Sequence, residues 1–243
     1  MCGIVGYAGS SSAIAPIIDG LGRLEYRGYD SAGICLLKNS KFHIIKKEGK
    51  LENLKAELKK HETITANIGI GHTRWATHGE VNDINAHPHG NEIFSIVHNG
   101  IIENAGKIRE NLAGQYDFVS QTDSETFLAL LTLEYQKLQD VKEAIVSAFK
   151  MVEGNSAFVI LQKDDHRIYS IKKAAPLVCG VNEDSGEVFV SSDPYALVGF
   201  CSKVIFPEDE VLAQGDHRAQ GDSYSFYDLD LKKSHAYKIQ EKQ

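Results

Sequence analysis

Cys2 directly follows the initiator methionine and precedes a short apolar run. A thiol is an intrinsically good nucleophile, and an α-amine of pKa roughly 7.7–8.0 is a base near neutral pH. Methionine aminopeptidases act before small residues, so removal of Met1 would place both groups on one amino acid. The position therefore indicates a nucleophile that carries its own base. A small apolar residue at the start of a strand is the alternative interpretation.

A second candidate segment, residues 24–33, places charged side chains between an apolar helix and an apolar strand. Arg27, Asp30 and Ser31 lie here, and charged groups in such surroundings need partners. We consider two interpretations of Arg27. It belongs to a structural ion pair, or it helps to position the N-terminal residue.

A third segment, residues 69–89, combines Arg74 with Trp75, which is the chain's only tryptophan, and with several histidines. An arginine fork binds a carboxylate through two parallel hydrogen bonds, which suits an amino-acid substrate. His87, His89 and His98 would be the ligands of a three-histidine metal site. Their spacing is weak evidence for zinc, so we expect no metal and interpret the loop histidines as solvated.

A fourth segment, residues 96–104, is an apolar strand that breaks at Asn99-Gly100. Asn-Gly is a frequent two-residue hairpin turn, which is one interpretation. Turns of this kind also expose backbone N–H groups. The functional interpretation is an oxyanion hole, in which the Asn99 amide and the Gly100 N–H face one developing negative charge.

The elements that must position these residues are mostly strands. Several of the predicted strands are apolar throughout and do not alternate apolar with polar residues, which indicates sheets covered on both faces. No β-α-β repetition is present, so two stacked sheets with helices outside are favoured over a doubly wound parallel sheet. We expect one domain over residues 1–243. The predicted strands are 3–8, 32–37, 68–72, 93–98, 157–161, 168–171, 188–190 and 204–206.

Four helices are predicted from apolar periodicity and cap residues. The first is capped by Ser11 or Ser12 and carries an apolar stripe from residue 14 to residue 24. A shorter surface helix spans residues 51–58. A buried helix starts at residues 122–125 and runs to Leu138, and a one-faced helix from Val141 ends at Gly154. Residues 213–223 read as a loop.

Composition limits the function classes. The 243 residues are 42% hydrophobic and 24% charged, and the net charge of −7 argues against nucleic acid or an anionic membrane as a partner. The N-terminal residues do not resemble a signal peptide, and no apolar stretch reaches membrane-spanning length, so we expect a cytoplasmic protein. The four cysteines lie far apart, which disfavours disulfides and zinc ribbons. We expect no cofactor.

Together these segments resemble one family. The chain is similar to the glutaminase domain of glutamine–fructose-6-phosphate aminotransferases, within the class II, N-terminal-nucleophile glutamine amidotransferases. In the second half of the chain the similarity is weaker and is best seen at 176–178 and 191–193. The matching segments of the first half are 2–6, 24–33, 72–79, 85–89, 98–104 and 120–125.

The resemblance implies an α+β fold, a four-layer αββα sandwich of two mainly antiparallel sheets. It also implies hydrolysis of L-glutamine to L-glutamate and ammonia through a glutamyl thioester. Cys2 would be the nucleophile and its α-amine the base, while Asn99 and Gly100 would hold the oxyanion. Arg27 would orient the N-terminal residue.

Substrate-binding residues are implied in the same way. Arg74 would pair with the α-carboxylate of glutamine and Asp123 with its α-ammonium. Asp123 is also well placed as a negative charge at a helix N-terminus. Thr77 and His78 would belong to a loop that closes over glutamine, and Trp75 would shield the ammonia.

Family members normally continue into sugar isomerase domains that bind fructose-6-phosphate and use the ammonia, and the full-length enzyme is a possible homodimer. We expect those domains to be absent here, because the chain ends at Gln243. The chain alone should therefore hydrolyse glutamine without aminating sugar. Two alternatives stay open: the glutaminase half of another class II amidotransferase, and a catalytically inactive module that binds glutamine.

Overall fold

The fold is built from two stacked antiparallel sheets, seen in a computed structural model that describes residues 2–61, 63–76 and 79–241. Within these residues one sheet has eight strands and the other six. In spatial order, the first sheet is β14 (Tyr237–Glu241), β11 (Lys203–Pro207), β9 (Val178–Asn182), β10 (Glu187–Ser191), β1 (Gly3–Ala8), β4 (Ile68–Arg74), β2 (Ser31–Lys38) and β3 (Lys41–Glu48). The second is β13 (Tyr224–Tyr227), β12 (Leu212–Gly215), β8 (Ile168–Lys173), β7 (Ser156–Gln162), β6 (Phe94–Gly100) and β5 (His89–Gly90).

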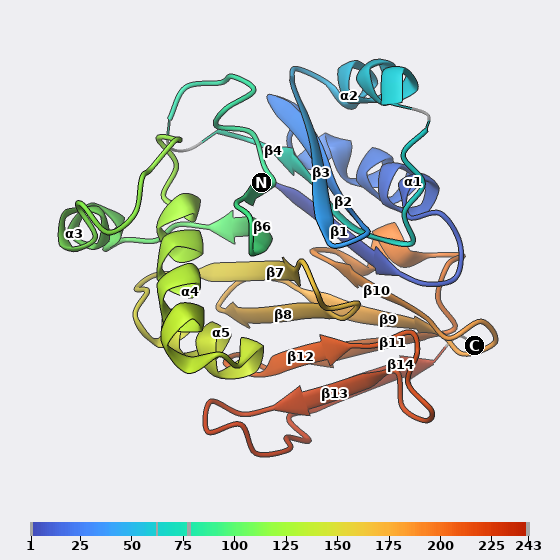
Figure 1. The fold of residues 1–243 in the computed structure, drawn as a ribbon. Coiled ribbons are helices and arrows are strands. Elements are labelled where there is room, and N and C mark those ends of the chain that lie inside the picture. Colours follow the sequence, from blue (N-terminus) through green and yellow to red (C-terminus); the bar gives the residue numbers. More distant parts are fainter. Residues whose placement is uncertain (1, 62, 77–78, 242–243) are drawn as a thin grey trace.

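Helices cover the outer face of each sheet (Figure 1). Helices α1 (Ile14–Leu24) and α2 (Leu51–Leu58) pack on the eight-stranded sheet. Helices α4 (Ser124–Leu138) and α5 (Val141–Lys150) pack on the six-stranded sheet, and α3 (Ala105–Asn111) lies beside α4. Three short 3₁₀ segments complete the described elements: η1 (Glu25–Arg27), η2 (Lys59–His61) and η3 (Pro194–Leu197). The predicted α+β, four-layer αββα architecture is confirmed.

Strand β1 shows why the central strands are apolar on both faces. Ile4 and Ala8 point into the core between the sheets, whereas Val5 and Tyr7 point into the core under the outer helices. Successive side chains of a strand alternate between faces, so a strand at the middle of four layers needs apolar residues throughout. The position of β1 fixes Cys2, the residue before it, at one end of the sandwich.

Several local predictions were wrong at element ends. Helix α1 begins at Ile14 with Ala13 as its N-cap and no side-chain cap bond, so neither Ser11 nor Ser12 caps it. The Ala13 N–H instead donates to the Ala66 carbonyl. Helix α5 ends at Lys150, before Gly154. The supposed loop 213–223 begins inside strand β12, and α3 was not predicted.

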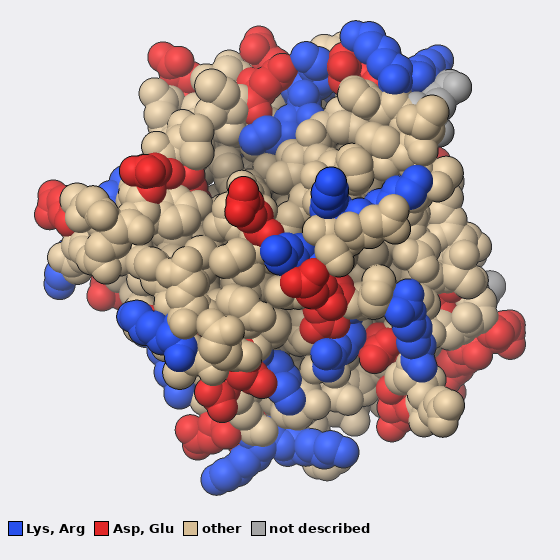
Figure 2. Space-filling model, in the orientation of Figure 1, with Lys and Arg blue, Asp and Glu red and all other residues tan. Residues whose placement is uncertain are grey.

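The face of the molecule in Figure 2 carries charges of both signs. On the face shown in Figure 2, lysine and arginine side chains are interspersed with aspartate and glutamate, and neither sign forms an extended patch. Among the described residues, no helix combines the length and apolar character needed to cross a membrane. The four cysteines are free; Cys35 and Cys179 are buried in the core between the sheets, and Cys201 is half-buried.

Candidate active site

Four chain segments meet around one cavity of about 340 Å³. Cys2 precedes β1, Arg74 ends β4, Asn99 and Gly100 end β6, and Asp123 is the N-cap of α4. Strands β1 and β4 are neighbours, with Gly3 opposite Thr73, and this pairing brings Cys2 close to Arg74. The volume lies at the lower end of the range for small-molecule sites, roughly 300–1,000 Å³. The candidates from these four segments therefore line one pocket, and their roles stay predictions.

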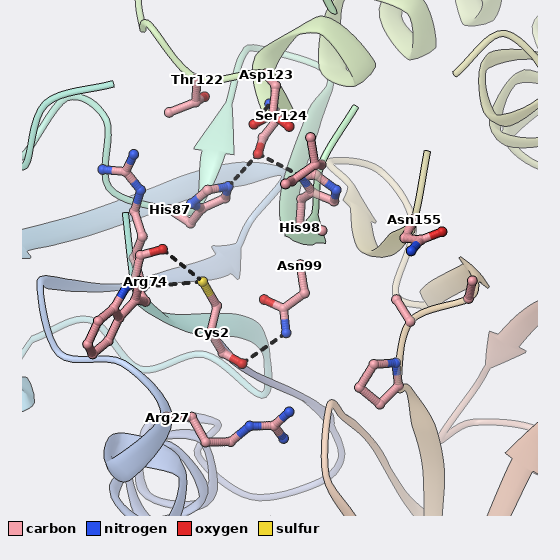
Figure 3. Close-up of a pocket in the computed structure, with 16 residues that line it drawn as sticks. Cys2, Arg27, Arg74, His87, His98, Asn99, Thr122, Asp123, Ser124 and Asn155 are labelled. Carbon is pink, nitrogen blue, oxygen red and sulfur yellow. Dashed lines mark hydrogen bonds between the residues drawn. The ribbon is translucent and has the colours of Figure 1, made fainter. Parts of the chain in front are cut away.

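Both the side chain and the backbone of Cys2 form hydrogen bonds with residues that line the cavity (Figure 3). Its thiol sulfur accepts a hydrogen bond from the Trp75 N–H at 3.2 Å, and its carbonyl oxygen accepts one from the Asn99 side-chain amide at 3.1 Å. Burial raises the pKa of the Cys2 thiol above its usual value, while the Trp75 hydrogen bond and the Arg74 charge oppose that rise. At neutral pH the resting group is therefore the protonated thiol.

Asn99 and Gly100 belong to a strand and not to a hairpin turn. They are the last residues of β6 and pair with Ala157 and Ser156 of β7. Gly100 has a φ of +129°, and a Cβ added there would lie 1.9 Å from the Asn155 carbonyl oxygen. Because that distance is far below van der Waals contact, only glycine fits. Both residues line the cavity at this end of the strand.

Arg74 and Asp123 bring opposite charges to the same cavity. The Arg74 guanidinium is buried and donates to the Glu80 carbonyl at 3.2 Å. Burial lowers its pKa, and the charges of Cys2, Asp30 and Asp123 oppose that effect. The Asp123 carboxylate accepts backbone hydrogen bonds from Ser124 at 3.0 Å and Ile102 at 2.8 Å, so its position is fixed.

Trp75 lines the cavity and leaves 47% of its surface exposed. Its ring meets the Tyr29 ring edge-on, with 5.9 Å between centroids. The following residue, Ala76, donates its N–H to the Asp30 carboxylate. This hydrogen bond links the chain after β4 to the segment after η1. The predicted closing residues, Thr77 and His78, lie outside the described residues.

Arg27 has its ion-pair partner far along the chain. Its guanidinium contacts the Asp193 carboxylate at 3.2 Å and the Ser192 carbonyl at 3.3 Å. The Ser192 hydroxyl in turn accepts the Ile4 N–H at 3.0 Å. The structure therefore contains the ion pair that was one interpretation of Arg27. The other interpretation, that Arg27 positions the N-terminal residue, stays a prediction.

The prediction of solvated loop histidines was wrong. His87, His89 and His98 are buried, since β5 pairs with β6 at the edge of the second sheet under α4. Their ring nitrogens face hydroxyl groups: Ser124 lies 2.8 Å from both His87 and His98, and Thr122 lies 2.9 Å from His89. In the part of the chain that the structure describes, no three His, Cys, Asp or Glu side chains are grouped to hold a metal ion.

Other wall residues were not singled out from the sequence. Asn155 and the segment from Ala174 to Pro176 line the cavity opposite the first-half residues. The sequence carried a partial signal for the second of these, since residues 176–178 belong to the resemblance. Asn155 has no such signal, because its place depends on the pairing of β6 with β7.

Comparisons with known proteins agree with this geometry. Residues 75–199, about half of the chain and including Trp75, Asn99, Gly100 and Asp123, match the family model described as a glutamine amidotransferase domain. The chain belongs to this glutamine amidotransferase family. This agrees with the predicted resemblance to glutamine amidotransferases.

Relatives of this amidotransferase chain include the glutamine–fructose-6-phosphate aminotransferases (isomerizing) of Clostridium acetobutylicum and Mesorhizobium japonicum. The first is 41% identical over 214 residues, which cover 86% of this chain and 34% of the relative. The second is 43% identical over 236 residues, which cover 96% of this chain and 38% of the relative. The chain thus spans about a third of the length of these curated relatives.

A solved structure has a similar fold. The glutamine phosphoribosylpyrophosphate amidotransferase of B. subtilis, complexed with ADP and GMP, superposes with a TM-score of 0.79 at 22% identity. The match covers 96% of this chain and 50% of that protein. The likeness therefore extends beyond the half of the chain that the family model matches.

Proposed function

We propose that this chain is a glutaminase domain, residues 1–243, that hydrolyses L-glutamine to L-glutamate and ammonia through Cys2. The observation that carries the proposal is the convergence on one cavity of a thiol, a guanidinium, a carboxylate and the Asn99 amide. A free amino acid with a side-chain carboxamide has a group for each of them. A peptide-linked glutamine lacks the charged α-groups that Arg74 and Asp123 would recognise.

In the proposed complex, Arg74 binds the α-carboxylate of glutamine and Asp123 binds its α-ammonium. The Asp123 carboxylate is already oriented by two backbone N–H groups and keeps lone pairs for a third donor. Two opposite charges at a fixed separation orient the substrate as well as select it. The side-chain carboxamide then extends toward Cys2.

The reaction needs a base, because burial keeps the Cys2 thiol protonated. Once Met1 is removed, the α-amine of Cys2 takes the thiol proton and the sulfur attacks the carboxamide carbon. Asn99 and Gly100 donate hydrogen bonds to the oxyanion that forms. The carbon–nitrogen bond breaks, and the α-ammonium returns the proton to the leaving ammonia.

The glutamyl thioester left on Cys2 is then cleaved by water. The α-amine takes a proton from the attacking water, and the resulting tetrahedral intermediate expels the thiolate. The thiolate recovers its proton, and L-glutamate leaves. Trp75, which lines the cavity and is partly exposed, would shield the ammonia, with Thr77 and His78 closing the loop over the substrate.

The use of the ammonia is a further part of the proposal. Since the relatives are glutamine–fructose-6-phosphate aminotransferases about three times as long, we propose that a sugar isomerase domain consumes the ammonia to make glucosamine-6-phosphate. The whole enzyme would be a cytoplasmic homodimer. Neither nucleic acid, a membrane nor a cofactor enters the proposed reaction.

An assay of ammonia and glutamate release, paired with intact mass, tests the proposal. We expect a processed chain without Met1 that turns over glutamine, and a Cys2→Ala variant that does not. Cys201→Ala is the matched control, since Cys201 is a half-buried cysteine that does not line the cavity. Glutamine turnover by Cys2→Ala would refute the mechanism. Processed wild-type protein that binds glutamine without turnover would favour the inactive binding module.

A further inference from the structure

A cluster of buried histidines, two of which (His87 and His98) line the cavity wall, takes no part in the proposed reaction. Four rings belong to it, and each side chain is at most 5% exposed. The centroids of His72 and His87 are 4.3 Å apart, and those of His87 and His89 are 4.6 Å apart. His98 stacks on Phe158 at 4.5 Å. Of these rings, His72 contacts the proposed oxyanion donor Asn99 directly.

The orientation of the Asn99 side-chain amide follows from its contact with Cys2. The atom facing the Cys2 carbonyl lies 3.1 Å from it, and a carbonyl oxygen only accepts hydrogen bonds. That atom must therefore be the NH₂ nitrogen, Nδ2. The other end of the amide, the acceptor Oδ1, then faces His72.

This orientation determines the tautomer of His72. Its Nε2 lies 3.0 Å from Asn99 Oδ1 and 3.0 Å from the His98 carbonyl oxygen. Both partners are acceptors, so Nε2 must carry the proton and donate it. The other ring nitrogen, Nδ1, is buried without a hydrogen-bond partner among the described residues. Burial also lowers the pKa of His72 to about 3, so the ring stays neutral.

Neighbouring rings have the same tautomer. A proton on His87 Nδ1, which is buried without a partner, would be an unpaired donor, so Nε2 carries it and donates to the Ser124 hydroxyl. Ser124 then donates to His98 Nδ1 at 2.8 Å, and His98 Nε2 donates to the Ser156 hydroxyl at 3.2 Å. His72 packs against this network, since its ring lies 4.3 Å from the His87 ring and its Nε2–H donates to the His98 carbonyl.

We propose that His72 is a positioning residue for glutamine hydrolysis: its Nε2–H holds the Asn99 amide so that the NH₂ faces Cys2 and the cavity. One amide hydrogen bonds the Cys2 carbonyl, and the second is left for the oxyanion. Without His72, the amide can rotate by half a turn and present Oδ1 to the developing negative charge. The inference rests on the function proposed above.

His72→Phe tests the inference, because phenylalanine keeps a ring in the cluster and removes the donor. His89→Phe is the matched control, a ring of the same cluster that bonds Thr122 and does not contact Asn99. We expect His72→Phe to lower kcat roughly 10- to 100-fold with KM little changed, since an oxyanion donor is worth about 10²–10³ in kcat. Alkylation of Cys2 by iodoacetamide, which forms no oxyanion, should proceed at the wild-type rate.

Two further variants separate positioning from loss of structure. In an Asn99→Ala background, His72→Phe should cost no additional activity, because the amide that it orients is gone. His72→Gln, whose amide nitrogen can replace Nε2–H, should recover part of kcat. A kcat for His72→Phe within about twofold of wild type, or a full further loss in the Asn99→Ala background, would overturn the inference.

Wild-type protein that does not hydrolyse glutamine would contradict the proposed function instead of this inference. In that case ¹⁵N NMR of the His72 ring still decides the inference. We expect a neutral ring protonated at Nε2 from pH 5 to pH 8. A ring protonated at Nδ1, or a charged ring in that range, would overturn the role of His72.

Discussion

The thiol of Cys2, the proposed nucleophile, lies in surroundings that favour its neutral form. Burial raises its pKa, although the Trp75 N–H and the Arg74 charge favour the thiolate. Activated cysteines more often have a lowered pKa. A separate base is therefore needed, and at this position the α-amine of the processed residue is the candidate.

This requirement predicts the pH dependence of the reaction. A protonated α-amine cannot accept the thiol proton, so kcat/KM should fall as pH drops below roughly 7.7–8.0, the usual α-amine range. Above that range it should level off. A pH profile of processed protein measures this. If kcat/KM instead climbs through the higher pH at which the buried thiol itself ionises, the thiolate forms without the amine and the base assignment is wrong.

Arg74→Lys tests the proposed binding of the substrate carboxylate. Lysine keeps the charge but loses the planar fork that makes two parallel hydrogen bonds. We expect KM for glutamine to rise about 10-fold or more, with a smaller change in kcat, in steady-state assays of glutamate release. Arg167→Lys, a change at an arginine paired with Asp165, is the control and should leave both constants as they are. An unchanged KM for Arg74→Lys would remove Arg74 from the site.

At the scale of elements, the end of β6 depends on a single glycine. A Cβ at residue 100 would overlap the Asn155 carbonyl, and the φ of +129° disfavours other residues. Gly100→Ala should therefore lower the free energy of unfolding by about 1–3 kcal/mol and abolish most activity. Chemical denaturation and the glutaminase assay measure the two effects.

Gly106→Ala is the matched control for this prediction. Gly106 lies in helix α3, and no atom lies within 4 Å of a Cβ added there. Alanine at an accommodating helix position is expected to stabilise the fold by roughly 0.5–1 kcal/mol. Equal stability changes in the two variants would show that the end of β6 tolerates a side chain.

The sequence predicted best those helices and strands whose own apolar residues repeat with the period of the element. Strand β1 and helices α2 and α4 were found because their apolar residues repeat with the right period. Helix α3 and strand β12 were missed, since both are short and their stability comes from packing against other elements. The same limit explains Ser11 and Ser12: the backbone of Ala13 bonds the Ala66 carbonyl, a contact that the local sequence does not reveal.

At the site, the sequence indicated the residues with reactive or charged groups, but it did not indicate which residues they contact. Cys2, Arg74, Asn99 and Asp123 have functional groups that are unusual at their positions, and they line one cavity. Their roles stay predictions. The partner of Arg27 lies 166 residues away, at Asp193, so only the fold brings the two together. His87 and His89 looked like loop residues because nothing local indicates the strand pairing that buries them.

At the scale of the whole molecule, the histidine cluster should make stability depend on pH. Burial lowers the pKa of His72 to about 3 and that of His98 to about 4, and His87 and His89 lie well below their usual value. The unfolded chain binds protons near pH 6.5, so the stabilising effect of keeping these rings neutral is complete above that pH. It is lost as pH falls toward the folded pKa values.

We therefore expect the free energy of unfolding to fall between pH 6.5 and pH 5, by up to roughly 1.4 kcal/mol per pH unit for each histidine. Carboxylates titrate mostly below this window. Urea denaturation at several pH values measures the slope of the unfolding free energy against pH. His89→Phe should lower this slope by the contribution of one histidine. A flat profile would show that the rings are protonated without unfolding.

Trapping the intermediate tests the central claim, that Cys2 attacks glutamine, most directly. Processed protein is mixed with glutamine, quenched in acid within the first turnovers, and digested for mass spectrometry. We predict a glutamyl group on the N-terminal Cys2 peptide, its disappearance as glutamine is exhausted, and its absence in Cys2→Ala. Full turnover without any adduct, continuing after Cys2 has been alkylated, would contradict the account.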